Sequence, residues 1–167
     1  QQLLRELAQA GVSWLQLDEP ILAVDLPPSW LDAVAAAYQA LALTPVRLIV
    51  GTYFGSVAAH LTLLKNLPVH GVHLDGVRAP EQLALFAQAW PENKVLSVGV
   101  IDGRNVWRAD LRQVLTQLQP LQAKLGKQLW LSSSCSLLHV PQDLAREDQL
   151  PDEIKQWLAF GVQKLAE

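Results

Sequence analysis

Polar and charged side chains follow five apolar segments of this sequence, where a parallel α/β protein would present them to a ligand. They are Asp18 and Glu19, Thr52 and Tyr53, Asp75 and Arg78, then Asp102, Arg104 and Asn105, and last Ser133, Ser134 and Cys135. Such carboxylates bind amines or cations, and an arginine clamps a carboxylate through paired hydrogen bonds. The same residue types are ordinary turn and helix-capping residues, so the pattern predicts a ligand site without fixing a reaction.

Two of these clusters each allow two interpretations. In the first cluster Pro20 holds Glu19 extended, so Asp18 and Glu19 could bind an amine, or one could accept hydrogen bonds from loop amides. These interpretations have equal support. The stretch from Arg104 to Arg108 could clamp a carboxylate, although a structural knot of salt bridges and stacking around its indole is favoured.

The cysteine and histidines give weak support for nucleophilic or metal chemistry. A nucleophilic Cys135 needs a histidine base, and His139 is close in sequence, but a small half-buried thiol is the favoured interpretation. His60 and His70 are predicted on the surface, and His73 in the core, bonded to backbone. A zinc site needs three or four Cys, His or carboxylate ligands, so no metal is expected in this chain.

The elements that must position these residues alternate between short apolar runs and longer helical patterns. An opening helix over residues 1–10 is expected to end at Gly11. Strands are predicted at 12–17, 46–50, 71–75, 94–101 and 128–132. Helices are predicted at 30–42 with Ser29 as N-cap, over about ten residues ending near Asn66, from Pro80 to near Trp90, at 110–125, and from near Pro151.

About five β-then-α units of this kind predict an α/β fold with a parallel sheet covered by helices. The two candidate architectures are a doubly wound open sheet and part of a (β/α)8 barrel. No G-x-G-x-x-G follows the first strand and no P-loop is present. The sequence has no linker or low-complexity segment, which indicates one domain.

Composition excludes several classes of protein. The chain has 167 residues, a formal net charge of −3, 50% hydrophobic and 17% charged residues, so a folded core is expected and disorder is not. No basic cluster favours nucleic acid, no apolar run approaches membrane-spanning length, and a single cysteine predicts a reducing compartment, the cytoplasm by default. The lack of methionine and the helical first residues predict a piece of a longer protein.

Four stretches together resemble the N-terminal domain of the cobalamin-independent methionine synthase family. They are residues 14–20 (WLQLDEP), 51–55 (GTYFG), 97–108 (SVGVIDGRNVWR) and 132–139 (SSSCSLLH). They occur in the family's order and spacing and cover nearly the whole chain. The first is shared by both halves of the enzyme, whereas GRNVWR and SCSLLH are more specific to the N-terminal half.

This resemblance implies two face-to-face (β/α)8 barrels and the transfer of a methyl group from 5-methyltetrahydrofolate polyglutamate to homocysteine, giving methionine. Zinc in the C-terminal barrel, which this chain lacks, keeps the homocysteine thiol deprotonated. The N-terminal barrel supports the interface and helps hold the folate tail. Residues 1–167 resemble the last five units of that N-terminal barrel, a TIM-type partial barrel that binds no cofactor of its own.

The resemblance also implies that the metal site has been lost in this half. Thr52 and Phe54 stand where the catalytic half has the two ligands of His-x-Cys, while Asp75 matches its glutamate ligand and Cys135 its last cysteine. Arg104 falls near the position of the catalytic histidine, and Asp18 resembles the aspartate that holds the homocysteine amino group. The expected role is therefore scaffold, with Asp18, Glu19, Asp102, Arg104 and Asn105 as substrate contacts on the barrel rim.

Open sheet edges in a partial barrel predict that the piece needs further surface: the rest of the enzyme, a second copy or another fragment. Two other functions stay open from the residues alone. One is a stand-alone folate- or carboxylate-binding half-barrel. The other is a different α/β enzyme that uses Asp18, Glu19 and Asp102 as acid and base.

Overall fold

The computed structural model describes all residues 1–167 and contains one parallel β-sheet with the strand order β1-β2-β3-β4-β5. Each strand pairs in parallel with the next one along the chain, so helices must connect them on the sheet's face. The strands are β1 (Trp14–Asp18), β2 (Arg47–Gly51), β3 (Gly71–Asp75), β4 (Val95–Ile101) and β5 (Leu129–Ser133). The predicted α/β class and parallel sheet are confirmed.

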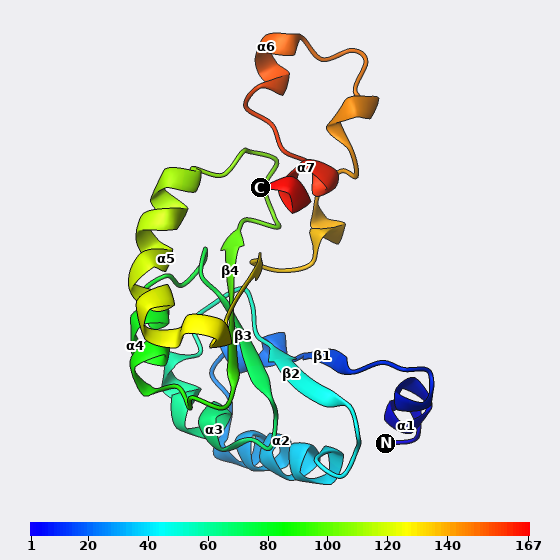
Figure 1. Cartoon of the computed structure of the whole chain (residues 1–167), viewed down its shortest axis with the longest axis vertical. Coiled ribbons are helices and arrows are strands. Elements are labelled where there is room, and N and C mark those ends of the chain that lie inside the picture. The colour runs from blue at the N-terminus through cyan, green and yellow to red at the C-terminus, as the bar shows by residue number, and fades with distance from the viewer.

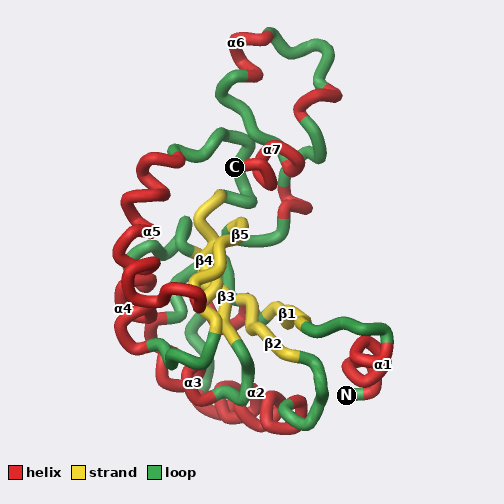
Figure 2. Tube along the Cα trace, in the orientation of Figure 1, coloured by secondary structure: helices red, strands yellow, loops and turns green.

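Helices α2 to α5 lie side by side along one face of the sheet (Figures 1 and 2). Each connects two neighbouring strands, as the alternating sequence pattern predicts. The helices are α1 (Gln2–Gln9), α2 (Pro28–Leu41), α3 (Leu61–Asn66), α4 (Gln82–Ala89), α5 (Leu111–Leu125), α6 (Asp152–Lys155) and α7 (Gly161–Ala166). None of them is long and apolar enough to span a membrane.

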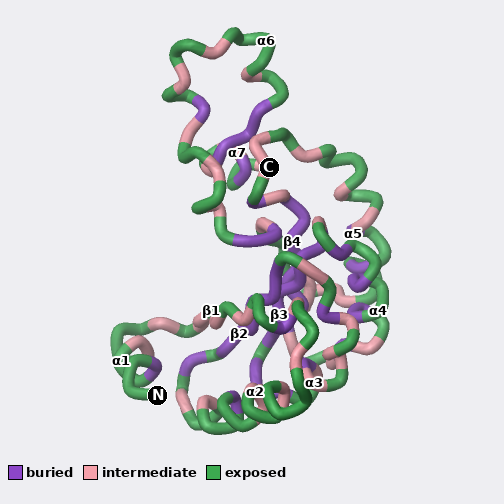
Figure 3. The backbone as a smooth tube through the Cα atoms, turned by 180° about the vertical axis from the view of Figure 1, so that it is seen from behind, coloured by how far each residue is buried: buried purple, intermediate pink, exposed green.

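The main hydrophobic core lies between the sheet and these helices. Alternate strand residues, such as Leu48, Val72 and Leu96, point to this side and are buried with Tyr38 and Phe86 from the helices. Burial is concentrated in the central strands β2, β3 and β4, whereas β1 and β5 are more exposed (Figure 3). The central strands therefore anchor the polar loops that follow them.

The opposite face of the sheet is concave and far more polar. Its side chains alternate with the core residues and include Gln16, Asp18, His73 and Ser97, in a register fixed by the strand pairing. The sheet curls enough for Trp14 of β1 to meet Trp130 of β5, with ring centroids 4.8 Å apart. The first and last strands thus touch across the concave face through side chains, although they share no backbone ladder.

Two details of the predicted helices are wrong. Helix α2 begins at Pro28 with Pro27 as its N-cap, because proline at the first helical position lacks only an N–H that has no partner there; Ser29 is already inside the helix. The predicted last helix is only the short α6, and a separate helix, α7, follows it. Antiparallel pairing of Leu158 with Trp107 draws the intervening chain out of the helix.

The segment between β5 and α7 projects from the end of the sheet where the strands finish (Figure 1). A small apolar cluster of Leu144, Leu158 and Phe160 holds its base together, packed against Val106. Backbone bonds from Arg108 N to Trp157 O (2.9 Å) and from Ala159 N to Val106 O (2.8 Å) attach it to the loop after β4. This projection is therefore coupled to the loop that carries the predicted rim residues.

Candidate functional site

The predicted rim residues fall into two groups. Asp102, Arg104 and Asn105 form one hydrogen-bonded loop after β4, whereas Asp18 and Glu19 lie at the end of β1 and are directed to different neighbours. No hydrogen bond or ion pair joins the two groups, and none joins Asp18, Glu19 and Asp102 to one another.

The two carboxylates of the Asp18–Glu19 pair have different hydrogen-bond partners. Glu19 accepts a hydrogen bond from Tyr38 Oη at 3.1 Å, on the side of the core helices. Asp18 accepts one from Gln16 Nε2 at 2.8 Å on the concave face, and its interaction with Tyr53 adds to burial in raising the pKa of that phenol. Asp18 is exposed and Glu19 is half-buried, so Asp18 is the more accessible of the two to a ligand at the rim.

The Asp102 carboxylate organises its own loop. Its Oδ1 accepts a hydrogen bond from the Arg104 amide at 2.8 Å, and its Oδ2 accepts one from Asn105 Nδ2 at 2.8 Å. The Arg78 guanidinium lies 4.0 Å from Oδ2 and is itself half exposed. An ion pair this exposed contributes little to stability, which leaves Arg78 available as a second rim cation.

Arg104 presents its guanidinium on an aromatic surface. Its Cζ lies 4.8 Å from the centroid of the Phe54 ring, and the same ring makes an edge contact with His139 at 5.9 Å between centroids. Phe54 is 41% exposed although aromatic side chains usually bury most of their surface. The rim therefore carries an exposed cation and an exposed aromatic face side by side, a combination suited to a planar or anionic ligand.

A structural knot holds the loop after β4, but not through the salt bridges and indole stacking predicted for it, since neither Arg104 nor Arg108 forms an ion pair. Arg104 stacks on Phe54 and not on the neighbouring indole. Arg108 donates from Nε to the Leu158 carbonyl oxygen at 3.3 Å, and Trp107 pairs with Leu158 through the backbone. The knot thus joins the β4 loop to the projection.

The positions that resemble metal ligands do not fit a metal ion. Thr52 is buried, and its Oγ1 donates to the His73 carbonyl oxygen at 2.7 Å. Phe54 has no coordinating atom. No group of three or more His, Cys, Asp or Glu side chains is arranged to hold a metal ion, in contrast to the three protein ligands that catalytic zinc sites use.

The Asp75 carboxylate holds two neighbouring loops in place through hydrogen bonds to their backbone amides. It is 1% exposed. Its oxygens accept hydrogen bonds from the backbone amides of Phe54 (3.0 Å), Val77 (3.0 Å) and Arg78 (2.8 Å). Phe54 has a φ of 75°, a left-handed conformation that costs a non-glycine residue about 1–3 kcal/mol. The hydrogen bond from the Phe54 amide to the Asp75 carboxylate stabilises that conformation, and so holds the Phe54 ring in its place beside Arg104.

Cys135 is a buried thiol, more enclosed than the half-buried group predicted. Burial raises its pKa, and the carboxylates of Asp75 and Asp102 act in the same direction. Its nearest hydrogen-bond partners are the Ser136 carbonyl oxygen at 3.7 Å and Ser134 Oγ at 4.0 Å, while His139 is exposed and faces Phe54. A thiol in this environment is protonated near neutral pH and is not activated as a nucleophile.

The structure confirms His73 as a buried histidine and His70 as an exposed one. His73 is buried, with Nδ1 3.0 Å from Ser97 Oγ and Nε2 3.3 Å from the Ser134 carbonyl oxygen. His70 is exposed, but its Nδ1 accepts the Leu48 amide proton at 3.2 Å and its ring meets Trp14 edge-on. Burial lowers the pKa of both imidazoles, and the Arg47 cation adds to the effect at His70.

These two histidines predict acid sensitivity. The unfolded-state pKa of about 6.5 lies above the folded-state value, so the unfolded chain takes up protons first as the pH falls below about 6.5, and stability is lost there. Urea unfolding at pH 7.5 and 5.5 should show a loss of about 1 kcal/mol from His73 alone. His73→Gln should reduce this pH dependence, while the exposed His139→Gln should retain it; equal slopes in all three proteins would contradict the assignment.

Two buried polar residues near the rim have no counterpart among the residues predicted from the sequence. Gln82, at the start of α4, accepts from Val57 N at 2.8 Å and donates to the Asp75 carbonyl oxygen at 3.1 Å. Lys164, on α7, is 4% exposed and donates to Asn105 Oδ1 at 3.2 Å and to the Trp107 carbonyl oxygen at 3.0 Å. Neither residue stands in a motif, so the sequence offered no signal for its burial.

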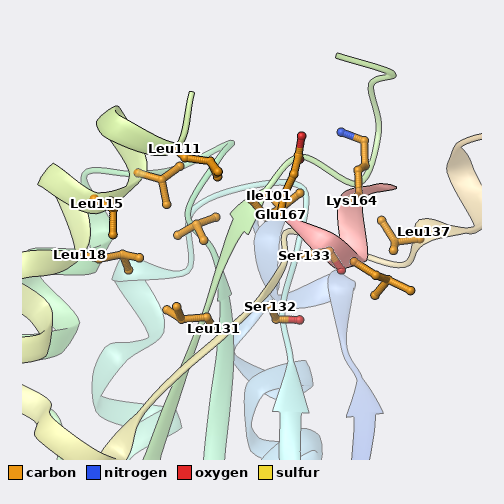
Figure 4. Close-up of a pocket in the computed structure, with 13 residues that line it drawn as sticks. Ile101, Leu111, Leu115, Leu118, Leu131, Ser132, Ser133, Leu137, Lys164 and Glu167 are labelled. Carbon is orange, nitrogen blue, oxygen red and sulfur yellow. The ribbon is translucent and has the colours of Figure 1, made fainter. Parts of the chain in front are cut away.

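An apolar groove of about 600 Å³ lies between α5, β5 and α7 (Figure 4). Its lining includes Leu115 and Leu118 of α5, Leu131 of β5, and Lys164 with Leu165 of α7. Leu131 is 59% and Leu165 78% exposed. The outer side of the edge strand β5 is thus less covered than that of β2, β3 or β4.

Comparison with known proteins agrees with the resemblance. Residues 1–126 match the family described as "Cobalamin-independent synthase, N-terminal domain". The chain is 54% identical over 165 residues to the 5-methyltetrahydropteroyltriglutamate–homocysteine methyltransferase of Paraburkholderia xenovorans (strain LB400), with 99% of this chain and 22% of the relative covered. The protein of the same name from Neisseria gonorrhoeae (strain ATCC 700825 / FA 1090) is 55% identical over 170 residues, with 99% and 22% covered. The chain therefore spans about a fifth of the length of these curated relatives.

Proposed function

Because the chain belongs to the cobalamin-independent synthase family through that family's N-terminal domain, we propose that it is part of a methyltransferase that makes methionine. In this proposal the methyl group passes from 5-methyltetrahydropteroyltriglutamate to homocysteine, the two substrates in the relatives' names. The observation that supports it most strongly is identity of 54% or more across 99% of the chain. A free-standing binding module or an unrelated α/β hydrolase would not require such agreement.

Within that enzyme, we propose that this chain is scaffold and not the catalytic centre. Thr52 and Asp75 are committed to backbone hydrogen bonds, Phe54 cannot coordinate, and burial raises the pKa of Cys135. The residues present do not fit zinc, so the metal that holds homocysteine in the family would belong to the other barrel. The contribution of this chain is to present its rim to the folate substrate.

Asp18, Glu19, Asp102, Arg104 and Asn105 are predicted as substrate contacts, and we propose that Asp18 and Arg104 contact the substrate while the other three support them. Arg104 on Phe54 is suited to the carboxylates of a glutamate tail. Asp18 is accessible to a cationic group. Glu19, Asp102 and Asn105 are occupied by protein partners and act by holding the loops in place.

We also propose that residues 1–167 form the C-terminal portion of an N-terminal (β/α)8 barrel. Two features support this architecture over an open doubly wound sheet. Trp14 and Trp130 meet across the concave face, as inward side chains from opposite strands of a barrel do. The groove beside β5 also lies where the helix after that strand would pack, and a second copy of the chain is the alternative occupant.

A chimera tests the proposed role directly. This chain would replace the matching segment of the Paraburkholderia xenovorans relative, and methionine formation would be measured with both substrates. The chimera should retain activity within about tenfold, whereas the 167-residue chain alone should form no methionine and bind no stoichiometric zinc. Tight stoichiometric zinc in the isolated chain, or an inactive but well-folded chimera, would contradict the proposal.

A further inference from the structure

Lys164 is a buried cation that no feature of the sequence singled out. Its side chain is 4% exposed. Lys164 lies on α7 and is one of the residues that line the groove between α5, β5 and α7 (Figure 4). Both of its hydrogen-bond acceptors are neutral: Asn105 Oδ1 at 3.2 Å and the Trp107 carbonyl oxygen at 3.0 Å. Burial lowers its pKa, and the nearby carboxylates of Glu167 and Asp102, which make no hydrogen bond to it, oppose this shift only in part.

A continuous set of hydrogen bonds leads from this ammonium group to the rim. Lys164 Nζ donates to Asn105 Oδ1, and Asn105 Nδ2 donates to Asp102 Oδ2 at 2.8 Å. The other oxygen of Asp102 accepts the Arg104 amide proton at 2.8 Å. Asn105 Oδ1 accepts from Lys164 Nζ and also from the Trp107 amide at 3.1 Å, so the two donors together fix which side of the Asn105 amide group donates to Asp102.

Stability alone does not account for a lysine at this position. Removing an ammonium group from water has a large free-energy cost, and apolar replacements of buried charges are often neutral or stabilising. Leu137 and Leu165 line the groove beside this side chain, while its ammonium group faces Asn105 Oδ1 and the Trp107 carbonyl oxygen. The β4 loop is held independently by the Trp107–Leu158 pairing and by Arg108.

We propose that Lys164 is a positioning residue that sets the orientation of Arg104 on the Phe54 ring by fixing the Asn105–Asp102 pair. This inference rests on the proposed role of Arg104 as a contact for an anionic substrate tail. It also gives α7 a function, because the helix brings a cation from the far end of the chain to the loop after β4. In this role Lys164 contacts Asn105 and the Trp107 carbonyl oxygen, and not the substrate.

The test compares Lys164→Met and Lys164→Arg with the exposed-lysine control Lys124→Met, all in the full 167-residue chain. Three quantities are measured: the urea midpoint, hydrogen exchange of the Arg104 amide, and the dissociation constant for 5-methyltetrahydropteroyltriglutamate. We expect Lys164→Met to keep or raise the urea midpoint, to speed Arg104 exchange about tenfold and to weaken binding about tenfold. Lys164→Arg should keep most of the protection of the Arg104 amide and most of the binding affinity. Lys124→Met should match the parent chain in all three quantities.

Asn105→Ala provides a second route to the same result. If the relay is correct, the Lys164→Met/Asn105→Ala double variant exchanges the Arg104 amide no faster than the more affected single variant, because both changes break one chain of contacts. Additive effects, an unchanged Arg104 amide in Lys164→Met, or a uniform loss of protection across the core would each overturn the inference. If the parent chain fails to bind the folate probe, the proposed rim function fails, while the exchange measurements still decide the role of Lys164.

Discussion

Gly99→Ala is expected to destabilise the chain by about 3 kcal/mol or more, the largest effect of any single methyl group added to the sheet. A Cβ at this position in β4 would lie 2.4 Å from Ser134 Cα, 2.8 Å from the Ser133 carbonyl oxygen and 3.0 Å from His73 Cε1. Two of these atoms belong to the backbone and cannot move aside as a flexible side chain would. The added methyl group would therefore force the loop after β5 away from the sheet.

Urea unfolding measures this cost, with Gly161→Ala as the matched control. A Cβ at Gly161 has its nearest neighbour, the Gln142 carbonyl oxygen, at 3.2 Å, and alanine is favoured over glycine in a helix. The control should lose at least 2 kcal/mol less than Gly99→Ala. Equal losses in the two variants would mean that the loop after β5 is free to shift.

Asp75→Asn is expected to destabilise the chain by about 2–4 kcal/mol, because an amide group cannot replace a carboxylate that accepts three backbone protons. The single Asn oxygen can accept only some of the hydrogen bonds from the Phe54, Val77 and Arg78 amides. The NH₂ group of the Asn side chain would face an amide donor. Phe54 should then leave its left-handed conformation, since the contact that stabilises it is lost.

Two measurements separate the local effect from the global one. Urea unfolding gives the loss of stability, and hydrogen exchange of the Phe54 amide reports the local contact directly. The exposed Asp25→Asn is the control and should change neither quantity. A stable Asp75→Asn variant with a protected Phe54 amide would show that the carboxylate charge is unnecessary.

The sheet could be predicted well from sequence because each strand is a short apolar run that ends in a turn. The run from Gly71 to Asp75 was predicted with the same bounds that the structure shows. The projection could not be predicted in this way, because residues after Asp152 have helical local preferences that yield to pairing of Leu158 with Trp107. Tertiary contacts of this kind routinely override local propensity.

The partners of the rim residues cannot be predicted from the sequence. Strand-end polarity located Asp102 and Arg104, and the contact of Arg104 with Phe54 then depends on a backbone conformation that no sequence pattern indicates. Lys164 was missed because the stretch from Gly161 onward has the composition of a solvated helix turn. Its burial results from packing against a loop that lies far away in the sequence.

The contact between Trp14 and Trp130 has a consequence for how the chain folds. Every strand pairs with its neighbour in sequence, so the sheet can be assembled through successive closures of loops of modest length, whose entropy cost grows only slowly. The two indoles come from opposite ends of the sheet, and their contact requires all the intervening strands to be in register. Docking of the tryptophans should therefore be a late event in refolding, and their fluorescence should change after the main development of secondary structure.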